Sequence, residues 1–454
     1  MTKQTGWLLL IFFLAPPFSQ AQQKLISLAT TVRRVVATDP GVLARQAESA
    51  AAQTETRRAE AKRLPRLDIT TGTGVGKSVD DLANVLLTGL VPVAVTNPHT
   101  RSRLASLSLS RPYVVPGASL EDTLYDGGQT AAAIELARLT ADKSRVGSKQ
   151  AREDVAYQAA LDYLRLARGQ ILQRDLEQYA QIAQLAAKAL AAQAKVGKIA
   201  PTDALVGASK YEAVEAALSN DRDDLRLWSQ LLRQLGGFPP DTAFDTRPLE
   251  AYLADFPLSP LPEQMEVSKT RAVRDAALDA RMAAEQLRSA RAARLPQVSF
   301  LAEYGFQFSN LLFTFRPGYN VGVEVTYPLF TGRRRSRQIA LSQERLIAAR
   351  LQARKTQEEQ AATDEQMAEE NRNVGRDLEA AKTSLAQASE VYRLARLKYD
   401  QGIESPVDLL KAAELWLKSR QQCLALAQSS LRLRWAVLRS QGQLVTTLEQ
   451  GVLP

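Results

Sequence analysis

Cysteine and histidine are almost absent from this chain, whose 454 residues contain one of each. The single cysteine, Cys423, excludes a disulfide within the chain, so packing or assembly must stabilise the fold. It lies in the helical run QQCLALAQ, which favours a small packing residue. His99 lies in the polar stretch VTNPHTRSR, which favours a solvent-facing side chain.

This scarcity limits the chemistry. No cluster of His, Cys and carboxylate residues has metal-ligand spacing, and no nucleophile has a histidine base. The sequence therefore predicts no catalytic residue, no metal site and no cofactor. The stretch GTGVGKS, from Gly72 to Ser78, nearly matches a phosphate-binding loop, but three residues separate Gly72 from Gly76 where that motif needs four. An enzyme built on that near match would also need ATP outside the cytoplasm.

Long apolar runs are missing after the first residues. The chain opens MTKQTGWLLLIFFLAPPFSQAQQ, with an apolar run from Trp7 to Ala15 and a small-x-small cleavage pattern ending at Ala21. This pattern predicts a secretory signal peptide. A membrane anchor is the weaker alternative, because the run is about half the roughly 20 residues that a spanning helix needs. No later apolar run is long enough, so a membrane role would have to come from β-strands.

The charge is unevenly balanced, with 58 Lys and Arg against 49 Asp and Glu, a net charge of +9 at pH 7. A basic surface suits an anionic partner. Because export is expected, anionic lipid headgroups of a membrane fit this role and nucleic acid does not.

The chain is an internal repeat. AKRLPRLDI at Ala61 returns as AARLPQVSF at Ala292, an offset of 231, and LYDGG at Leu124 returns as LFTGR at Leu329, an offset of 205. GKIAPTD then matches GIESPVD at the offset of 205. The offset of 231 also pairs GTGVGKS with the aromatic-rich EYGFQFS, which predicts a strand there. Its three glycines, Gly72, Gly74 and Gly76, would share one face of that strand.

Each half has the same order of elements: a helix, a strand pair, a very long helix, a short turn and a returning helix. Period-two alternation in LDITTGTGV, RLASLSLS, QVSFLAEYGFQFS and YNVGVEVTYPLF predicts four strands, each about ten residues long, as in tilted membrane-spanning strands. Long stretches of strong helix formers without proline predict helices on the order of 100 Å long. The predicted segments are a signal peptide (1–21); a first repeat (22–235) with strands at about 66–112, a long helix at 128–196 and a returning helix at 204–235; an irregular proline-rich segment (236–264); a second repeat (265–442) with strands at about 297–328, a long helix at 332–401 and a returning helix at 407–440; and a C-terminal tail (443–454).

With this plan the chain resembles the TolC-like outer membrane efflux protein family, the outer membrane factors of tripartite export systems. The resemblance rests on the duplicated halves, the strand pairs, the L-[YF]-x-G entry into each long helix and the G-x(5)-D turn at its far end. It implies a mainly α fold in which duplicated long-helix coiled-coil hairpins form an α-barrel. Four strands per protomer would contribute to a trimeric 12-stranded transmembrane β-barrel.

The resemblance also implies a function and a location. The chain would be a homotrimeric channel in the outer membrane of a Gram-negative type bacterium, extending into the periplasm. As the passive exit duct of a tripartite efflux or type I secretion system, it would work with a periplasmic adaptor and an inner membrane pump. Drugs, metal ions, polysaccharides and proteins all stay open as cargo.

In the family the two G-x(5)-D turns are the periplasmic tips where the channel closes and an adaptor docks. By position, the residues expected at the tips and adaptor docking surface are Gly197, Lys198, Pro201, Gly402, Glu404 and Pro406, and those expected at the pore constriction are Thr202, Asp203, Tyr399 and Asp408.

Two alternatives accompany these assignments. Thr202, Asp203 and Asp408 are also compatible with helix N-caps. Glu404 stands where the family can have a basic residue, and this acidic side chain could instead meet Lys198 of the other hairpin.

A periplasmic coiled-coil adaptor or scaffold of an export complex is the alternative function. Such a protein would carry one hairpin and would not need strand pairs in both halves. One motif belongs to neither account: the run from Gly332 to Arg335 places three arginines at the start of a helix, where cations oppose the dipole. It is either a solvated face or a contact with inner-leaflet headgroups.

Overall fold

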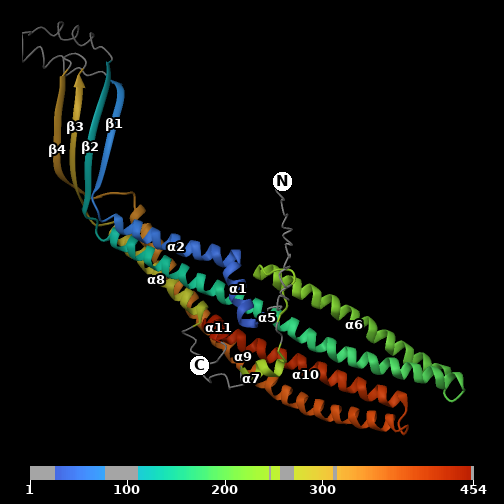
Figure 1. Cartoon of the computed structure of the whole chain (residues 1–454). Coiled ribbons are helices and arrows are strands. Elements are labelled where there is room, and N and C mark those ends of the chain that lie inside the picture. Colours follow the sequence, from blue (N-terminus) through green and yellow to red (C-terminus); the bar gives the residue numbers. More distant parts are fainter. Residues whose placement is uncertain (1–25, 77–110, 245–246, 256–269, 310–313, 451–454) are drawn as a thin grey trace, which may run out of the picture. The chain divides into compact units, whose positions relative to one another are not determined.

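The computed structural model of the chain describes residues 26–76, 111–244, 247–255, 270–309 and 314–450. The predicted signal peptide (1–21) and the predicted strand RLASLSLS lie outside these residues. The described chain is mostly helical, with one antiparallel sheet (Figure 1). The helices are α1 (Leu28–Thr38), α2 (Pro40–Ala61), α5 (Gln129–Lys195), α6 (Pro201–Gly236), α7 (Leu249–Asp255), α8 (Arg271–Ala292), α9 (Arg334–Asp400), α10 (Pro406–Gln441) and α11 (Leu444–Gln450), and the strands are β1 (Arg66–Gly76), β2 (Arg111–Tyr125), β3 (Gln297–Ser309) and β4 (Thr314–Thr326).

Two compact units divide the chain. The helical unit contains α1, α6, α7, α10 and α11, and the sheet unit contains all four strands, α8 and most of α2. The two longest helices, α5 and α9, contribute residues to both. The helical unit comprises Met1–Ala44, Lys149–Glu266 and Ala362–Pro454, and the sheet unit comprises Arg45–Ser148 and Val267–Ala361.

The four longest helices repeat in length and in position. α5 and α9 have 67 residues each, and α6 and α10 have 36 each. α9 and α10 begin and end 205 residues after α5 and α6, which is the offset found in the sequence. Within these helices proline occurs only at the first position of α6 and α10, where an N–H would have no helical partner. In the helical unit they form two hairpins, α5/α6 and α9/α10 (Figure 1).

A continuous apolar core holds the helical unit together. Trp435 and Tyr163 are among its largest fully buried side chains. The Tyr163 ring meets Phe244 edge-on at 6.1 Å between centroids, and its hydroxyl donates to the Ile26 carbonyl at 3.2 Å. Cys423 is buried in the same cluster, which confirms the predicted packing residue.

The predicted C-terminal tail includes a short helix, α11. Its apolar side chains join the core, and the buried Glu153 carboxylate on α5 accepts a hydrogen bond from the Val445 amide at 3.2 Å. Burial raises the pKa of Glu153, while this hydrogen bond opposes the rise. Sequence pattern alone missed α11 because its seven residues are too few for a clear periodicity.

The sheet has the strand order β1-β2-β3-β4, with every neighbouring pair antiparallel. The second strand extends beyond the predicted pair at 66–112, because β2 runs through VVPGASLED to Tyr125. Prolines made that stretch look irregular in the sequence. Among the described residues, Pro112 and Pro116 pair with β1 but not with β3, because the β2–β3 register begins at Gly117. The N–H groups that the prolines lack therefore interrupt no hydrogen bonds between β2 and β3.

The near phosphate-binding loop is a strand. Gly72, Gly74 and Gly76 lie in β1 and pair with Val115, Tyr113 and Arg111 of β2. Alternate residues of a strand lie on the same face, so the three glycines share one side of the sheet, as predicted. The nucleotide-site interpretation of this stretch is therefore wrong for the part that the structure describes.

Candidate functional site

The two hairpin turns have the same backbone design. The helices α5 and α9 end just before Gly197 and Gly402, which have φ of 71° and 74°. Nothing lies within 4 Å of a Cβ built on either glycine, so the left-handed backbone, and not lack of space, favours glycine there. The amides of Lys198 and Ile403 close the turns by donating to carbonyls at the ends of the long helices, both at 2.9 Å.

The second turn has a side-chain cap. Ser405 is the N-cap of α10: its hydroxyl accepts from the Asp408 amide at 3.2 Å and donates to the Asp408 carboxylate at 2.7 Å. Pro406 follows at the first helical position and is buried. Asp408 is therefore not the N-cap that the sequence allowed, but the third residue of the helix, paired with the cap as in a capping box.

The first turn has no such cap. Its N-cap residue is Ala200, which stands 205 residues before Ser405 and has no side-chain oxygen. Pro201 occupies the first helical position, and Thr202 and Asp203 lie exposed in the first turn of α6. The N-cap interpretation of Thr202 and Asp203 is therefore wrong, and both side chains are left available for other contacts.

The charges at the second tip are locally compensated. Lys411 Nζ lies 3.3 Å from Asp408 Oδ1, one helical turn away. The Ser405 hydroxyl, and then Lys411, lower the pKa of Asp408, so this carboxylate is ionised at neutral pH.

Glu404 has its ion pair within its own hairpin. Its Oε2 lies 3.8 Å from Lys398 Nζ, at the end of α9. The expected contact with Lys198 is not formed among the described residues. The turn geometry explains this: the Glu404 amide donates to the Lys398 carbonyl at 3.3 Å, which folds the acidic residue back over α9.

The expected constriction residues do not touch one another inside one chain. Tyr399 is half-buried and packs against a core cluster below the tips, which contains Leu409 and Leu410. No hydrogen bond joins it to Asp203 in the part of the chain that the structure describes.

Ion pairs that were not predicted from the sequence link the two hairpins within one chain. Arg439 Nε on α10 lies 3.8 Å from Asp154 Oδ1 on α5, and two further pairs lie closer to the tips. Arg420 Nε on α10 lies 3.2 Å from Asp175 Oδ2 on α5, with 24% and 14% of the two side chains exposed. Lys210 on α6 pairs with Glu414 on α10. A signal for the Lys210–Glu414 pair exists in the repeat, because these residues are 204 positions apart and so lie nearly at equivalent places of the two returning helices.

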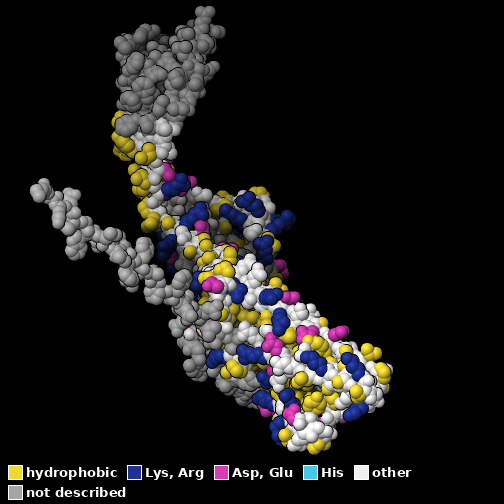
Figure 2. All heavy atoms as spheres, turned by 45° about the vertical axis from the view of Figure 1, so that its right-hand side comes forward, with side chains coloured by type: hydrophobic (Ala, Val, Ile, Leu, Met, Phe, Trp, Pro, Cys, Tyr) yellow, Lys and Arg dark blue, Asp and Glu magenta, His cyan; other side chains and the backbone are white. Residues whose placement is uncertain are grey.

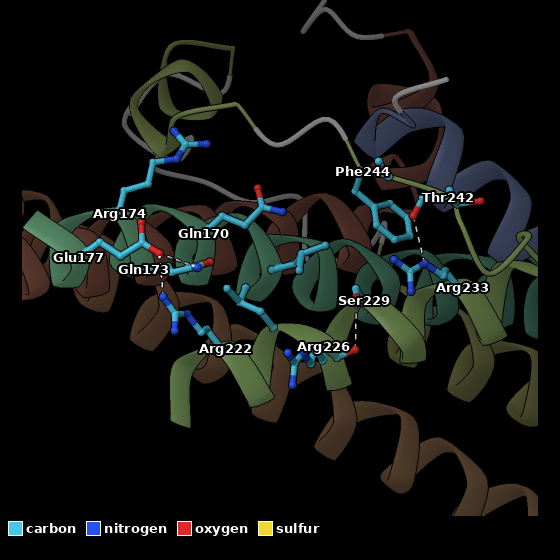
Figure 3. Close-up of a pocket in the computed structure, with 13 residues that line it drawn as sticks. Gln170, Gln173, Arg174, Glu177, Arg222, Arg226, Ser229, Arg233, Thr242 and Phe244 are labelled. Carbon is cyan, nitrogen blue, oxygen red and sulfur yellow. Dashed lines mark hydrogen bonds and ion pairs between the residues drawn. The ribbon is translucent and has the colours of Figure 1, made fainter. Parts of the chain in front are cut away.

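A hollow of about 660 Å³ lies between α5, α6 and the segment before α7 (Figure 3). Much of its charge is compensated: Arg222 lies 3.4 Å from Glu177, and Arg233 Nε donates to the Thr242 carbonyl at 3.0 Å. We therefore assign no ligand to this hollow between the helices. The arginines around it are Arg174, Arg222, Arg226 and Arg233.

The sheet separates two kinds of surface. Register partners lie on the same face, and on one face these partners are almost all apolar, including Ile69, Tyr319, Val321 and Val323, which are 86%, 83%, 60% and 59% exposed. The members of this apolar face are Leu67, Ile69, Thr71, Ala118, Leu120, Val298, Phe300, Ala302, Tyr304, Tyr319, Val321, Val323 and Val325, and Asp122, the register partner of Phe300, is the acidic residue among them. The opposite face is polar and glycine-rich, with Ser119, Glu303 and Asn320 in one row and Gly117, Gly305 and Gly318 in the next.

No helix in the part of the chain that the structure describes combines the length and the apolar composition that crossing a membrane requires. Within the same ranges, no three His, Cys, Asp or Glu side chains are grouped so as to hold a metal ion.

Comparison with known proteins finds a family profile in the second half of the chain. Residues 264–442 match the profile of the family described as "Outer membrane efflux protein". The resemblance expected from the repeat is thereby confirmed, since these residues contain the second strand pair, the second hairpin and the tip at Gly402. Among curated proteins, none matches the chain.

Solved structures extend the likeness to nearly the whole chain. The outer membrane protein VceC of Vibrio cholerae is 19% identical, with a TM-score of 0.72 over 91% of this chain and 96% of that one. The outer membrane channel CmeC of Campylobacter jejuni is 14% identical, with a TM-score of 0.71 over 94% and 90%. The MtrE outer membrane channel of Neisseria gonorrhoeae is 14% identical, with a TM-score of 0.66 over 92% and 89%. The TolC-type fold therefore extends over the first half of the chain as well as over residues 264–442, as expected.

Proposed function

We propose that three copies of this chain form an outer membrane duct that reaches into the periplasm. The observation that carries the proposal is the sheet, which has an apolar face, a polar face and two open edges. β1 and β4 each lack a partner strand on their outer side within the described chain. In a membrane, unpaired backbone groups are too costly to leave open, so the sheet requires further strands from other copies to close.

The two faces support a barrel with lipid outside and water inside. The apolar face would contact lipid, and the face with Glu303, Asn320 and the glycines would line the lumen. A ring of three copies would pair β4 of each with β1 of the next, so that no edge stays open.

The long helices support the same assembly. At 1.5 Å per residue, a 67-residue helix is about 100 Å long, far more than the roughly 30 Å of a bilayer core. α9 also exposes apolar side chains along its length, among them Leu341, Leu351 and Leu394, which are 45%, 62% and 41% exposed. Contact with the helices of a neighbouring copy would cover them.

We further assign the hairpin tips to closure and docking. The residues Gly197, Lys198, Pro201, Gly402, Glu404 and Pro406 would form the docking surface for a periplasmic adaptor, and Thr202, Asp203, Tyr399 and Asp408 would surround the constriction between copies. Exposed apolar residues at the tips support protein docking: Val196 and Leu205 at the first, and Ile403 at the second, are 68%, 69% and 72% exposed. Figure 2 brings the hairpin end forward and shows apolar side chains among basic ones there.

As a duct the protein would be passive, with no reaction of its own. An inner membrane pump, reached through the adaptor, would supply the energy. The rival assignment, a periplasmic adaptor, does not account for a sheet with an apolar face 60% or more exposed at Ile69, Tyr319 and Val321.

Fractionation tests the proposal. The full chain should sediment with the outer membrane and should migrate in gels as a heat-sensitive species of three chains. A soluble periplasmic monomer would overturn the duct and favour the adaptor. Crosslinkers placed at Lys198 and Glu404 should then capture the adaptor, and through it the pump.

A further inference from the structure

All four connections between the sheet and the helices meet at one end of the sheet. The antiparallel order places the starts of β1 and β3 beside the ends of β2 and β4. Close contacts bind the connections together: a Cβ on Gly127 would lie 2.7 Å from the Leu295 Cβ, and Arg294 donates to the Ser336 hydroxyl at 3.0 Å. The connections therefore form one surface in the sheet unit.

This surface is strongly basic. Its exposed cations, called here the basic collar, are Lys62, Arg63, Arg291, Arg294, Arg333, Arg334 and Arg337. None of them has an ion pair among the described residues. The connecting segments contain one acid, Asp126, and its carboxylate is occupied by the amides of Gly128 and Thr130 at 2.9 and 2.5 Å. The connecting segments are therefore strongly basic, while the acids Asp68, Glu121, Asp122 and Glu324 lie on the adjoining ends of the strands.

An apolar and aromatic belt adjoins the collar. Tyr125 ends β2, and Tyr327, Leu329 and Phe330 follow β4; they are 49%, 55%, 89% and 87% exposed. The belt continues the apolar face of the sheet toward the cations. Tyrosines at the edge of an apolar band, followed by cations, are typical of a membrane–water interface.

Folding of the single chain does not explain the collar. α9 begins with Arg334 and has no acidic residue in its first turn, so its cations oppose the helix dipole. Arg333 has φ of 62°, a left-handed conformation that costs about 1 kcal/mol outside glycine. Charge of opposite sign, brought by a partner, would offset the unfavourable interaction with the helix dipole.

We propose that the basic collar binds the phosphate headgroups of anionic phospholipids at the periplasmic surface of the outer membrane. The proposal rests on the proposed function, which places the apolar face in lipid. Arginine guanidinium groups donate paired hydrogen bonds to phosphate oxygens, and the belt would contact the adjoining acyl chains. The headgroup contact would fix the depth of the barrel in the membrane.

Lipid selection from a mixed membrane tests this proposal. The purified trimer is inserted into vesicles of equal parts phosphatidylcholine and phosphatidylglycerol and extracted with its surrounding lipid in polymer discs. The collar variant is R333Q/R334Q/R337Q. The control variant is R281Q/R345Q/R350Q, which removes the same charge from exposed, unpaired positions farther along α8 and α9.

The wild type and the control should enrich phosphatidylglycerol about two- to fivefold, with the effect fading at high salt, and the collar variant should show almost none. All three should still insert and conduct. Equal enrichment in the collar variant and the control would overturn the collar as the binding surface, as would a wild type that inserts and conducts without any enrichment. A collar variant that loses trimerisation would instead assign the surface to a subunit contact. Failure of the wild type to insert at all would overturn the duct itself.

Discussion

Arg420 on α10 contacts Asp175 on α5 at 3.2 Å, and water reaches less than a quarter of either side chain. The pair joins the two hairpins beside the cluster that contains Leu176, Leu409 and Leu417. An ion pair between the two hairpins resists their separation.

Loss of the Arg420–Asp175 pair should destabilise the helical unit. We expect R420A to lower the free energy of unfolding by about 1–3 kcal/mol, because it leaves a largely shielded carboxylate without its partner. Denaturant unfolding of the solubilised protein measures this. R354A is the matched control, since Arg354 pairs with Glu358 on an exposed stretch of α9 and should contribute less than about 0.5 kcal/mol. Equal losses in the two variants would contradict a special role for the link.

Loosening the second tip should open the duct. We expect Y399F/E404A to raise single-channel conductance, because the double variant removes the Glu404–Lys398 pair and the tyrosine hydroxyl near the expected constriction. K398A should have part of this effect, and K198A should have little. An unchanged conductance in the double variant would show that these residues do not help to close the tip. An effect of K198A alone would favour the pairing of Glu404 with Lys198 of the other hairpin.

The missing cap of the first turn should be repairable. Ala200 lies at the N-cap of α6, where its counterpart Ser405 caps α10. We expect A200S to stabilise the first tip, and S405A to weaken the second, each by about 1 kcal/mol. Hydrogen exchange at the first amides of α6 and α10 reports the two changes separately. Faster exchange in A200S would show that the new hydroxyl does not cap.

Asp221 should make stability depend on pH. Burial, and then the nearby Asp224, raise its pKa from 3.8 to about 6, while Arg168 opposes the rise. The folded state therefore holds this proton more tightly than the unfolded chain, and stability falls as the pH rises from about 4 to 6. D221N should remove this slope and stabilise the protein above pH 6 by about 1 kcal/mol or less, because the site is partly solvated. Unfolding curves at pH 4.5 and pH 7.5 test it; an unchanged slope in D221N would assign the dependence to other groups.

Bulk on the glycine face of β1 should impair assembly. Gly72 pairs with Val115, while the preceding Thr71 lies on the opposite, apolar face. We expect G72L to reduce the amount of trimer in the outer membrane, because the lumen side of the strand is crowded once the barrel closes. T71L places the same side chain toward lipid and should assemble normally. Equal assembly of the two variants would show that this face has room to spare.

The repeat let the sequence predict most of the fold. Period-two alternation marked β1, β3 and β4, and proline-free stretches marked α5 and α9, because both signals extend over many residues. The full length of β2 was missed, since Pro112, Pro116 and Gly117 favour a turn locally and only pairing with β1 and β3 overrides them.

The tips were predictable in position and less so in detail. Glycine, proline and aspartate at a constant offset located both turns. The pairing of Glu404 with Lys398 depends on how the turn folds back over α9. The N-cap is Ser405 and not Asp408 because α10 begins at Pro406, three residues earlier than an Asp408 cap would require. The Arg420–Asp175 pair joins positions 245 residues apart, which no local pattern encodes.

Single-channel recording of the wild-type protein in a planar bilayer tests the central claim most directly. The account predicts discrete, long-lived conductance steps of one size from the purified trimer, small at rest because the tips are closed. Purified, bilayer-inserted trimer that shows no conductance, even in the Y399F/E404A variant, would contradict the assignment of this chain as a duct.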